Sequence, residues 1–167
     1  MAAKDITKLQ IGHYNATFDG TALGYTREGS TFEYDPQYAP IRVDDYGETP
    51  VDYRGAGERV SVKIRLAQND LATMAEAFPQ ATAAAERIDG GAIAGASMRA
   101  KAGVLHLTPA ISGMGEDVTL WKAVCISKIT LDYKINDQFV YELEFVGLPD
   151  TNKAEGKQLF TIGDTTA

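Results

Sequence analysis

The stretch Val60-Ser61-Val62-Lys63-Ile64-Arg65-Leu66 alternates strictly between apolar and polar side chains. Successive side chains of a β-strand point to opposite faces, so the apolar residues of this stretch share one face and the polar residues share the other. Such a strand covers a hydrophobic core with one face and meets solvent with the other. The stretch therefore predicts a half-buried β-sheet.

Two further alternating runs, 129–135 and 139–145, flank the tripeptide Asn136-Asp137-Gln138, which has the composition of a turn. Together they predict a β-hairpin. A three-residue loop keeps both apolar sets on one face, whereas a two-residue loop would place an apolar face opposite a polar one. We therefore predict the three-residue loop. The predicted cross-strand pairs are Ile135 with Phe139, Tyr133 with Tyr141, and Leu131 with Leu143.

Shorter signals complete a mainly β outline with one helix. The spacing i, i+3, i+4, i+7 predicts a helix over about 70–78 that buries one face, with Asn69 as its cap and Pro79 as its end. The segment 81–85 is compatible with another helical turn, and 89–97 is a small-residue loop. The apolar residues of the helical stripe are Leu71, Met74, Ala75 and Phe78. Further strands are predicted over 11–18, 22–34, 103–108, 118–127 and 157–162.

The segment from about 35 to 57 does not follow this regular pattern. Pro36, Pro40 and Pro50 interrupt it, and it carries more acidic than basic residues. Its aromatic and aliphatic side chains are too numerous for a free linker, so we predict an arm that docks on another surface, in the form of an extended loop or hairpin. A loop folded back on its own domain is the alternative. The candidate contact residues are Tyr38, Ile41, Val43, Tyr46, Val51 and Tyr53.

Composition and charge narrow the function. With 167 residues, 44% hydrophobic and 23% charged, the chain is expected to form a single domain over 1–167 with its own core. The formal net charge of −7 disfavours tight binding to a nucleic-acid backbone. No secretory signal is recognisable and no apolar run reaches the roughly 20 residues of a membrane span, so we expect synthesis in the cytoplasm and no membrane partner.

The residues of enzyme and metal chemistry are sparse. His13 and His106 are the only histidines and stand in no recognisable motif, and Cys125 is the only cysteine. Metal sites and nucleophilic catalysis require clusters of such residues at defined spacing. Glu142 and Glu144 share one face of a predicted strand, where they are better explained as its polar side than as a catalytic pair. We therefore predict no catalytic residues, no metal and no cofactor.

Three stretches in this order resemble the tail tube proteins of tailed bacteriophages. They are IGHYNATFDG at 11–20, LGYTREGS at 23–30 and IRVDDYGETPVD at 41–52. The resemblance lies in the layout, which extends over most of the chain: a Gly-bounded first strand, a Leu-Gly second strand, an acidic Gly-Thr-Pro loop, an alternating strand and a short helix.

The resemblance implies a small β-barrel or sandwich with one short flanking helix at about 70–78. Subunits of that family form hexameric rings, which stack into a hollow tube with an acidic lumen that conducts DNA during ejection. On this layout the N-terminal arm (1–10), the inter-ring loop (35–57) and the polar C-terminal segment (150–167) are the candidates for stacking contacts. The candidate lumen residues are Thr130, Asp132, Lys134, Glu142 and Glu144.

The resemblance also implies a location and partners. The chain would be assembled in the host bacterial cytoplasm and reside in the virion tail, with copies of itself, a tape-measure protein, a tail terminator, a baseplate and, in contractile tails, a sheath as partners. Alternatives are the tube protein of a contractile secretion system, another tail component, or a β-barrel that binds a small apolar ligand. The aromatic lining of such a ligand site would be Tyr133, Phe139, Tyr141 and Phe145.

Overall fold

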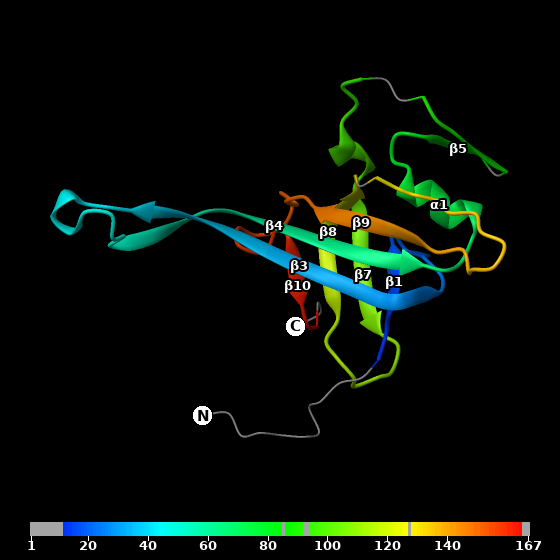
Figure 1. The fold of residues 1–167 in the computed structure, drawn as a ribbon, viewed down its shortest axis with the longest axis horizontal. Coiled ribbons are helices and arrows are strands. Elements are labelled where there is room, and N and C mark those ends of the chain that lie inside the picture. Colours follow the sequence, from blue (N-terminus) through cyan, green and yellow to red (C-terminus); the bar gives the residue numbers. More distant parts are fainter. Residues whose placement is uncertain (1–11, 85, 92–93, 127, 165–167) are drawn as a thin grey trace.

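The computed structural model describes residues 12–84, 86–91, 94–126 and 128–164, and these form a mainly β fold with one α-helix (Figure 1). Eight antiparallel strands make one sheet in the order β2-β1-β7-β8-β9-β4-β3, with β10 paired to β8. The sheet stays open and is folded over a core like a sandwich. Its strands are β1 (Tyr14–Phe18), β2 (Thr21–Ala22), β3 (Thr26–Ile41), β4 (Asp52–Leu66), β7 (Gly103–Pro109), β8 (Val118–Cys125), β9 (Tyr141–Gly147) and β10 (Phe160–Ile162).

The strand β8 allows the sheet to fold over because the neighbour along one of its edges changes. Residues 118–120 of β8 pair with β7 and β10, whereas residues 123–125 pair with β9, and Ala123 also pairs with Gly103 of β7. The strand β10 therefore packs across the molecule against β3. Its Phe160 ring lies 5.3 Å from the ring of Phe32 and 5.5 Å from that of Tyr34, between centroids.

The core confirms the alternation that predicted the sheet. Val60, Val62, Ile64 and Leu66 of β4 are all 0% exposed. Their partners on β9 are Phe145 opposite Val62, Leu143 opposite Ile64 and Tyr141 opposite Leu66. Burial of one such side chain contributes about 1.5–3 kcal/mol. These two strands therefore form the centre of the hydrophobic core.

The predicted hairpin of 129–135 with 139–145 is wrong in its first strand. Residues 128–134 form no strand, and β9 pairs with β4 and β8 instead. The pairing with β4 is favoured because it joins two fully buried apolar faces. Ile129, Leu131 and Phe139 still pack against the core, but Tyr133 and Ile135 are 78% and 102% exposed. The Tyr133 and Phe139 rings stack at 5.3 Å across the turn.

The helix α1 (Leu71–Ala77) confirms the prediction over 70–78 but presents a different face. Thr73, Met74 and Ala77 are buried, whereas Leu71 is 43% exposed. Asp70, not Asn69, occupies the N-cap position, and its side chain makes no capping hydrogen bond. The helical turn considered for 81–85 is wrong, because β5 (Thr82–Ala84) pairs there with β6 (Arg87–Asp89) and Ile88 packs against the core.

The other predicted strands are found, with shifted ends. The strands β1, β7, β8 and β10 occupy the predicted positions, and β3 extends the predicted 22–34 to residue 41. The N-terminal arm predicted at 1–10 lies outside the described residues. In the C-terminal segment, the described part after Asp150 folds back on its own domain, where the Lys153 ammonium lies 3.6 Å from the centroid of the Trp121 ring. No helix among the described residues is long and apolar enough to cross a membrane.

Candidate functional site

The segment 35–57 projects from the body as a two-stranded arm (Figure 1). The strands β3 and β4 run without interruption from the core into this arm, where Pro36 lies opposite Glu58 and Ile41 lies opposite Asp52. A short 3-10 helix (Asp44–Tyr46) closes the tip. The arm is thus an extended hairpin, which was one of the predicted forms. The alternative prediction, a loop folded back on its own domain, is wrong.

One face of the arm continues the core face of the sheet. The core side of β3 runs from Phe32 through Tyr34 and Pro36 to Tyr38 and Pro40, because alternate residues share a face. A register shift between Gln37 and Tyr38 adds one residue to β4, which brings Tyr53 opposite Pro40 on this same face. Tyr38 and Tyr53 are 62% and 61% exposed. The arm therefore presents an aromatic and proline-rich face to its surroundings.

The tip of the arm, residues 42–52, combines apolar side chains with negative charge. Val43, Tyr46 and Val51 are 42%, 66% and 47% exposed. Four acidic residues of the tip outnumber Arg42, which lies 3.4 Å from Glu48. Of the predicted contact residues, Tyr38 and Tyr53 lie on the aromatic face, Val43, Tyr46 and Val51 lie at the tip, and the half-buried Ile41 lies on the opposite face.

Prolines occupy the open edge of β3 along the arm. The carbonyl of Ile41 accepts a hydrogen bond from the Val51 amide of the returning chain at 2.9 Å, so odd-numbered residues of β3 point their backbone groups toward β4. Pro36 and Pro40 therefore face the open edge, where they remove two N–H donors. This edge of the arm is poorly suited to adding another strand, so contacts along it depend on side chains.

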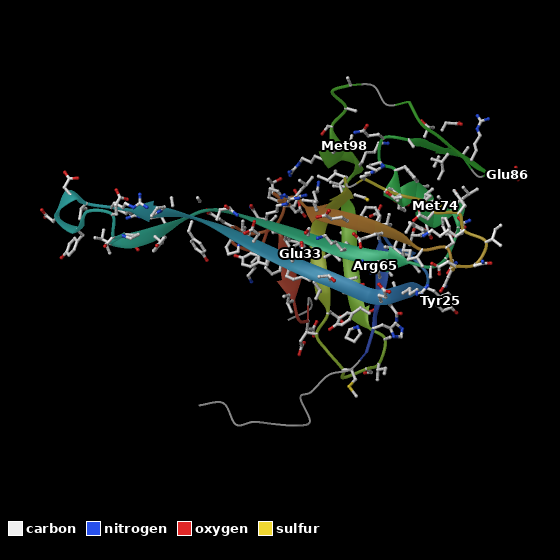
Figure 2. All side chains as sticks on the ribbon, viewed as in Figure 1. Tyr25, Glu33, Arg65, Met74, Glu86 and Met98 are labelled. Carbon is white, nitrogen blue, oxygen red and sulfur yellow. The ribbon has the colours of Figure 1, made fainter. Side chains whose placement is uncertain are left out.

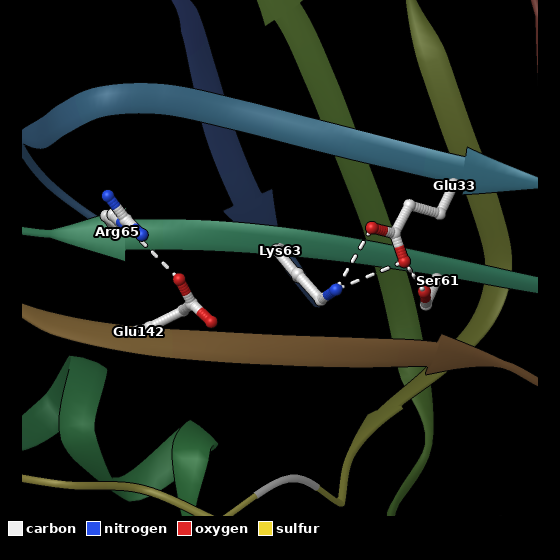
Figure 3. A network of polar contacts seen from close by, with 5 residues as sticks. All are labelled: Glu33, Ser61, Lys63, Arg65 and Glu142. Carbon is white, nitrogen blue, oxygen red and sulfur yellow. Dashed lines mark hydrogen bonds and ion pairs between the residues drawn. The ribbon is translucent and has the colours of Figure 1, made fainter.

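The polar face of β3, β4 and β9 carries a row of ion pairs (Figure 3). The Lys63 ammonium lies 3.0 Å and 3.1 Å from the two carboxylate oxygens of Glu33. The Arg65 guanidinium donates to Glu142 at 2.9 Å and also contacts Glu28. The hydrogen bond to Glu33 raises the pKa of Lys63 above its ordinary value, and the bond to Glu142 does the same for the pKa of Arg65. Both cations therefore remain charged and already have carboxylate partners.

The predicted lumen residues lie along this same face. Thr130, Asp132, Lys134 and Glu142 border one hollow together with Arg65. Glu144 borders a neighbouring hollow formed with Glu33, Asp35, Arg59 and Ser61. Sequence analysis overlooked Glu33, Lys63 and Arg65 as members of this surface. Lys63 and Arg65 could have been found from the polar residues of the 60–66 stretch, because these residues occupy the same face of the sheet as Glu142 and Glu144.

The histidines lie apart from both surfaces. On β7, the Nδ1 atom of His106 lies 2.7 Å from the hydroxyl of Thr119, and its Nε2 atom lies 3.7 Å from the carboxylate of Asp117. Among the described residues, no group of three or more His, Cys, Asp or Glu side chains is arranged to hold a metal ion.

Comparison with solved structures finds chains with a similar fold. No protein-family model matches the chain, and no curated protein matches it. A chain in the solved structure "Virion of native gene transfer agent (GTA) particle" has a similar fold, with a TM-score of 0.50 and 9% sequence identity. The similarity covers 97% of this chain and 100% of that chain. At 9% identity the match shows a similar fold only, over nearly the full length of both chains.

Proposed function

We propose that this protein is the structural subunit of a phage tail tube, which forms hexameric rings that stack into a hollow conduit for DNA. The observation that carries the proposal is the arm, because a two-stranded extension with an exposed aromatic face is suited to burial against another molecule. The similar chain belongs to a virion, which supports a structural role in a particle of that kind. The resemblance of the sequence to tail tube proteins points the same way.

The charged face of β3, β4 and β9 is suited to line the lumen. It carries the acids Glu28, Glu33, Asp35, Glu142 and Glu144 and the bases Arg59, Lys63 and Arg65. The excess of carboxylates repels phosphate groups, and Lys63 and Arg65 are held by carboxylates of their own chain. DNA would thus pass without being retained. Thr130, Asp132 and Lys134 extend this surface along the adjoining segment.

Assembly into a ring also covers the open edges of the sheet. Exposed strand edges invite pairing with another chain, and a closed ring of identical subunits uses them in a defined way. The proposed partners are other copies of the chain, a tape-measure protein, a tail terminator, a baseplate and, in a contractile tail, a sheath. Assembly would take place in the host bacterial cytoplasm, and the product would reside in the virion tail.

The rival functions differ in what they require of the fold. A secretion-system tube or another tail component would use the same surfaces. The ligand-binding barrel has less support, because the sheet stays open and two of its proposed lining residues fill the core. Tyr141 is 2% exposed, and the Phe145 ring packs 5.0 Å from that of Phe18. We further propose that the protein has no enzymatic activity, in view of the contact surfaces described above.

Electron microscopy of the purified chain over a range of concentrations tests the proposal. In the arm-deleted variant, residues 36–58 are replaced by Asn-Gly, a two-residue turn that joins the paired residues Asp35 and Arg59. The control is Tyr133→Ser, which removes an exposed aromatic residue elsewhere. We expect tubes from the wild-type chain and the control, and no stacking from the arm-deleted variant. A wild-type chain that stays monomeric at the highest concentrations would overturn the proposal.

A further inference from the structure

The open edge of β3 carries outward-facing backbone groups where the strand crosses the body, before the arm begins. Even-numbered residues of β3 point their N–H and C=O groups away from β4, and before the arm these are Ser30, Phe32 and Tyr34. β3 is the last strand of the sheet, and among the described residues no backbone group bonds to this edge. A register shift at 27–29 limits the stretch on one side, and Pro36 limits it on the other. We call residues 30–35 the β3 edge; Glu33, which Figure 2 labels, lies within it.

The Ser30 hydroxyl gives a second sign that this edge lacks a partner. Its oxygen atom is buried and makes no hydrogen bond to any described residue. Folded proteins seldom leave a buried polar atom unpaired, and an unprotected strand edge is a template for another strand. The two observations come from the side chain and from the backbone, and both indicate a site that another chain fills.

The segment 128–134 has the alternation of a strand but no strand pairing. Ile129 and Leu131 pack against the core and stay half-buried, whereas the even-numbered residues border the charged hollow beside β9. The chain then turns back into β9, and the rings of Tyr133 and Phe139 stack across this turn (Figure 1). The segment therefore runs antiparallel to β9. It forms the margin of the charged face opposite the β3 edge.

We propose that the β3 edge of one copy receives the segment 128–134 of the neighbouring copy in the ring as an antiparallel strand, an inference that rests on the proposed function. β3 and β9 run in the same direction, because each is antiparallel to β4. The segment 128–134 thus runs opposite to β3. Cyclic symmetry keeps the same direction in the neighbouring copy, so the two stretches meet antiparallel.

Matching the two faces determines the register of this pairing. Apolar side chains must lie opposite apolar ones, because a shift by one residue exchanges the faces of a strand. A shift by two residues in one direction places Glu33 opposite Asp132, and in the other direction it places Ser30 opposite Leu131. Both shifts are less favourable, since like charges or a polar and an apolar side chain would meet. The remaining register pairs Ser30 with Tyr133, Thr31 with Asp132, Phe32 with Leu131, Tyr34 with Ile129, and Asp35 with Lys128.

This register buries apolar surface that the single chain leaves open. Tyr34 is 46% exposed, and Phe32, Ile129 and Leu131 are each only half-buried. On the charged face it places the exposed Asp35 opposite the exposed Lys128, which is a favourable cross-strand pair. The three residues with outward-facing backbone groups all lie opposite apolar residues of the segment. Hydrogen bonding, burial and charge therefore favour the same register.

Disulfide formation in the full-length chain tests the pairing. Thr31→Cys with Asp132→Cys places two exposed thiols opposite each other, at the Cα separation of about 4.5–5.5 Å that a disulfide tolerates. Within one chain β4 and β9 lie between them, about 14 Å at the usual strand spacing, so a bond must join two chains. Oxidation of the assembled chain should give a ladder of covalent multimers. The native Cys125 is buried.

The controls identify which surfaces meet. Thr31→Cys alone and Asp132→Cys alone should give no linked species, whereas an equimolar mixture of the two should give dimers and nothing larger. Thr31→Cys with Glu155→Cys, an exposed residue outside the segment, should give no ladder. Dimers of Thr31→Cys alone would show that the β3 edge pairs with a second β3 edge, and this would overturn the proposal.

A proline at the β3 edge tests the hydrogen bonds themselves. Tyr34→Pro removes one outward-facing N–H and leaves the bonds from β3 to β4 in place. Tyr34→Ala is the matched control, because both variants lose the ring contact with Phe160 and the hydroxyl bond to Glu58. We expect Tyr34→Pro to form rings only at a concentration about fivefold higher than Tyr34→Ala does, as seen by electron microscopy. Urea unfolding verifies that both variants fold, and equal concentrations for the two folded variants would contradict the pairing.

The two proposals fail in different ways. If the wild-type chain assembles and the arm-deleted variant does not stack, but the ladder of Thr31→Cys with Asp132→Cys is absent, neighbouring subunits join elsewhere and only the edge inference is overturned. If the wild-type chain stays monomeric, the proposed function and the inference that rests on it fall together.

Discussion

Gly147 lies at the end of β9, where this strand approaches Val60 of β4. An added Cβ atom at Gly147 would lie 2.4 Å from Cγ1 of Val60 and 3.6 Å from Cδ2 of Leu120. Val60 is 0% exposed and β-branched, so its side chain has little freedom to rotate away. Overpacking of this kind costs about 1–3 kcal/mol. We therefore expect Gly147→Ala to lower the free energy of unfolding by about 2 kcal/mol, which lowers Tm by about 4–8 °C for a domain of this size.

Urea unfolding, followed by the fluorescence of Trp121 at concentrations below assembly, measures this effect. Gly55→Ala is the matched control, because an added Cβ at Gly55 meets nothing within 4 Å. Its effect should be neutral or stabilising by about 0.4–1 kcal/mol, since alanine restricts the unfolded chain. Combining Gly147→Ala with Val60→Ala should cost less than the sum of the two single losses, because the truncated Val60 makes room for the new methyl group. Equal stability of Gly147→Ala and Gly55→Ala would refute the close approach of β9 to β4.

Three further substitutions test other parts of the structure. Tyr141→Phe removes the hydroxyl that donates to the Gln68 carbonyl at 3.2 Å, and we expect urea unfolding to show a loss of about 0.5–1.5 kcal/mol. Burial raises the pKa of the Glu76 carboxyl, so the folded chain binds this proton more tightly and loses stability as pH rises through the unfolded and then the folded pKa. The stability of Glu76→Gln relative to wild type should therefore increase between about pH 4 and pH 7 in denaturant titrations, and a constant difference would contradict this. Glu33→Gln breaks the exposed pair with Lys63 and should change stability only slightly in urea unfolding, with any loss shrinking in high salt.

The sequence identified strand faces correctly but did not identify strand neighbours. Alternation in 60–66 and 139–145 predicted which residues are buried, because the period of two is a local property of the backbone. The partner of β9 was assigned to the adjacent run 129–135, whereas the structure pairs it with β4, far away in the chain. Both pairings keep apolar residues together, and only the three-dimensional fit of the whole core distinguishes them.

The arm shows a different limit of sequence analysis. Prolines and glycines over 35–57 indicated irregular structure, yet Pro36 and Pro40 lie within a long strand. A proline is compatible with a strand when its nitrogen faces an open edge, and the sequence does not reveal which edge is open. The candidate contact residues Tyr38, Val43, Tyr46, Val51 and Tyr53 are exposed, and their part in a contact stays a prediction. The apolar hollow at the end of α1 was not predicted, since its lining residues, among them Phe78, Met98 and Ile129, come from separate stretches of the chain.

The continuity of β3 and β4 from the core into the arm has a mechanical consequence. Ladder hydrogen bonds lie perpendicular to the strands, and the arm points along them. A pull on one strand of the arm, along its length, tends to slide β3 past β4, so the bonds of the ladder share the load instead of opening one after another. Tension along a stack of such subunits would therefore be carried by many bonds at once, and it would be delivered directly into the half of β4 that carries the buried residues Val60, Val62, Ile64 and Leu66.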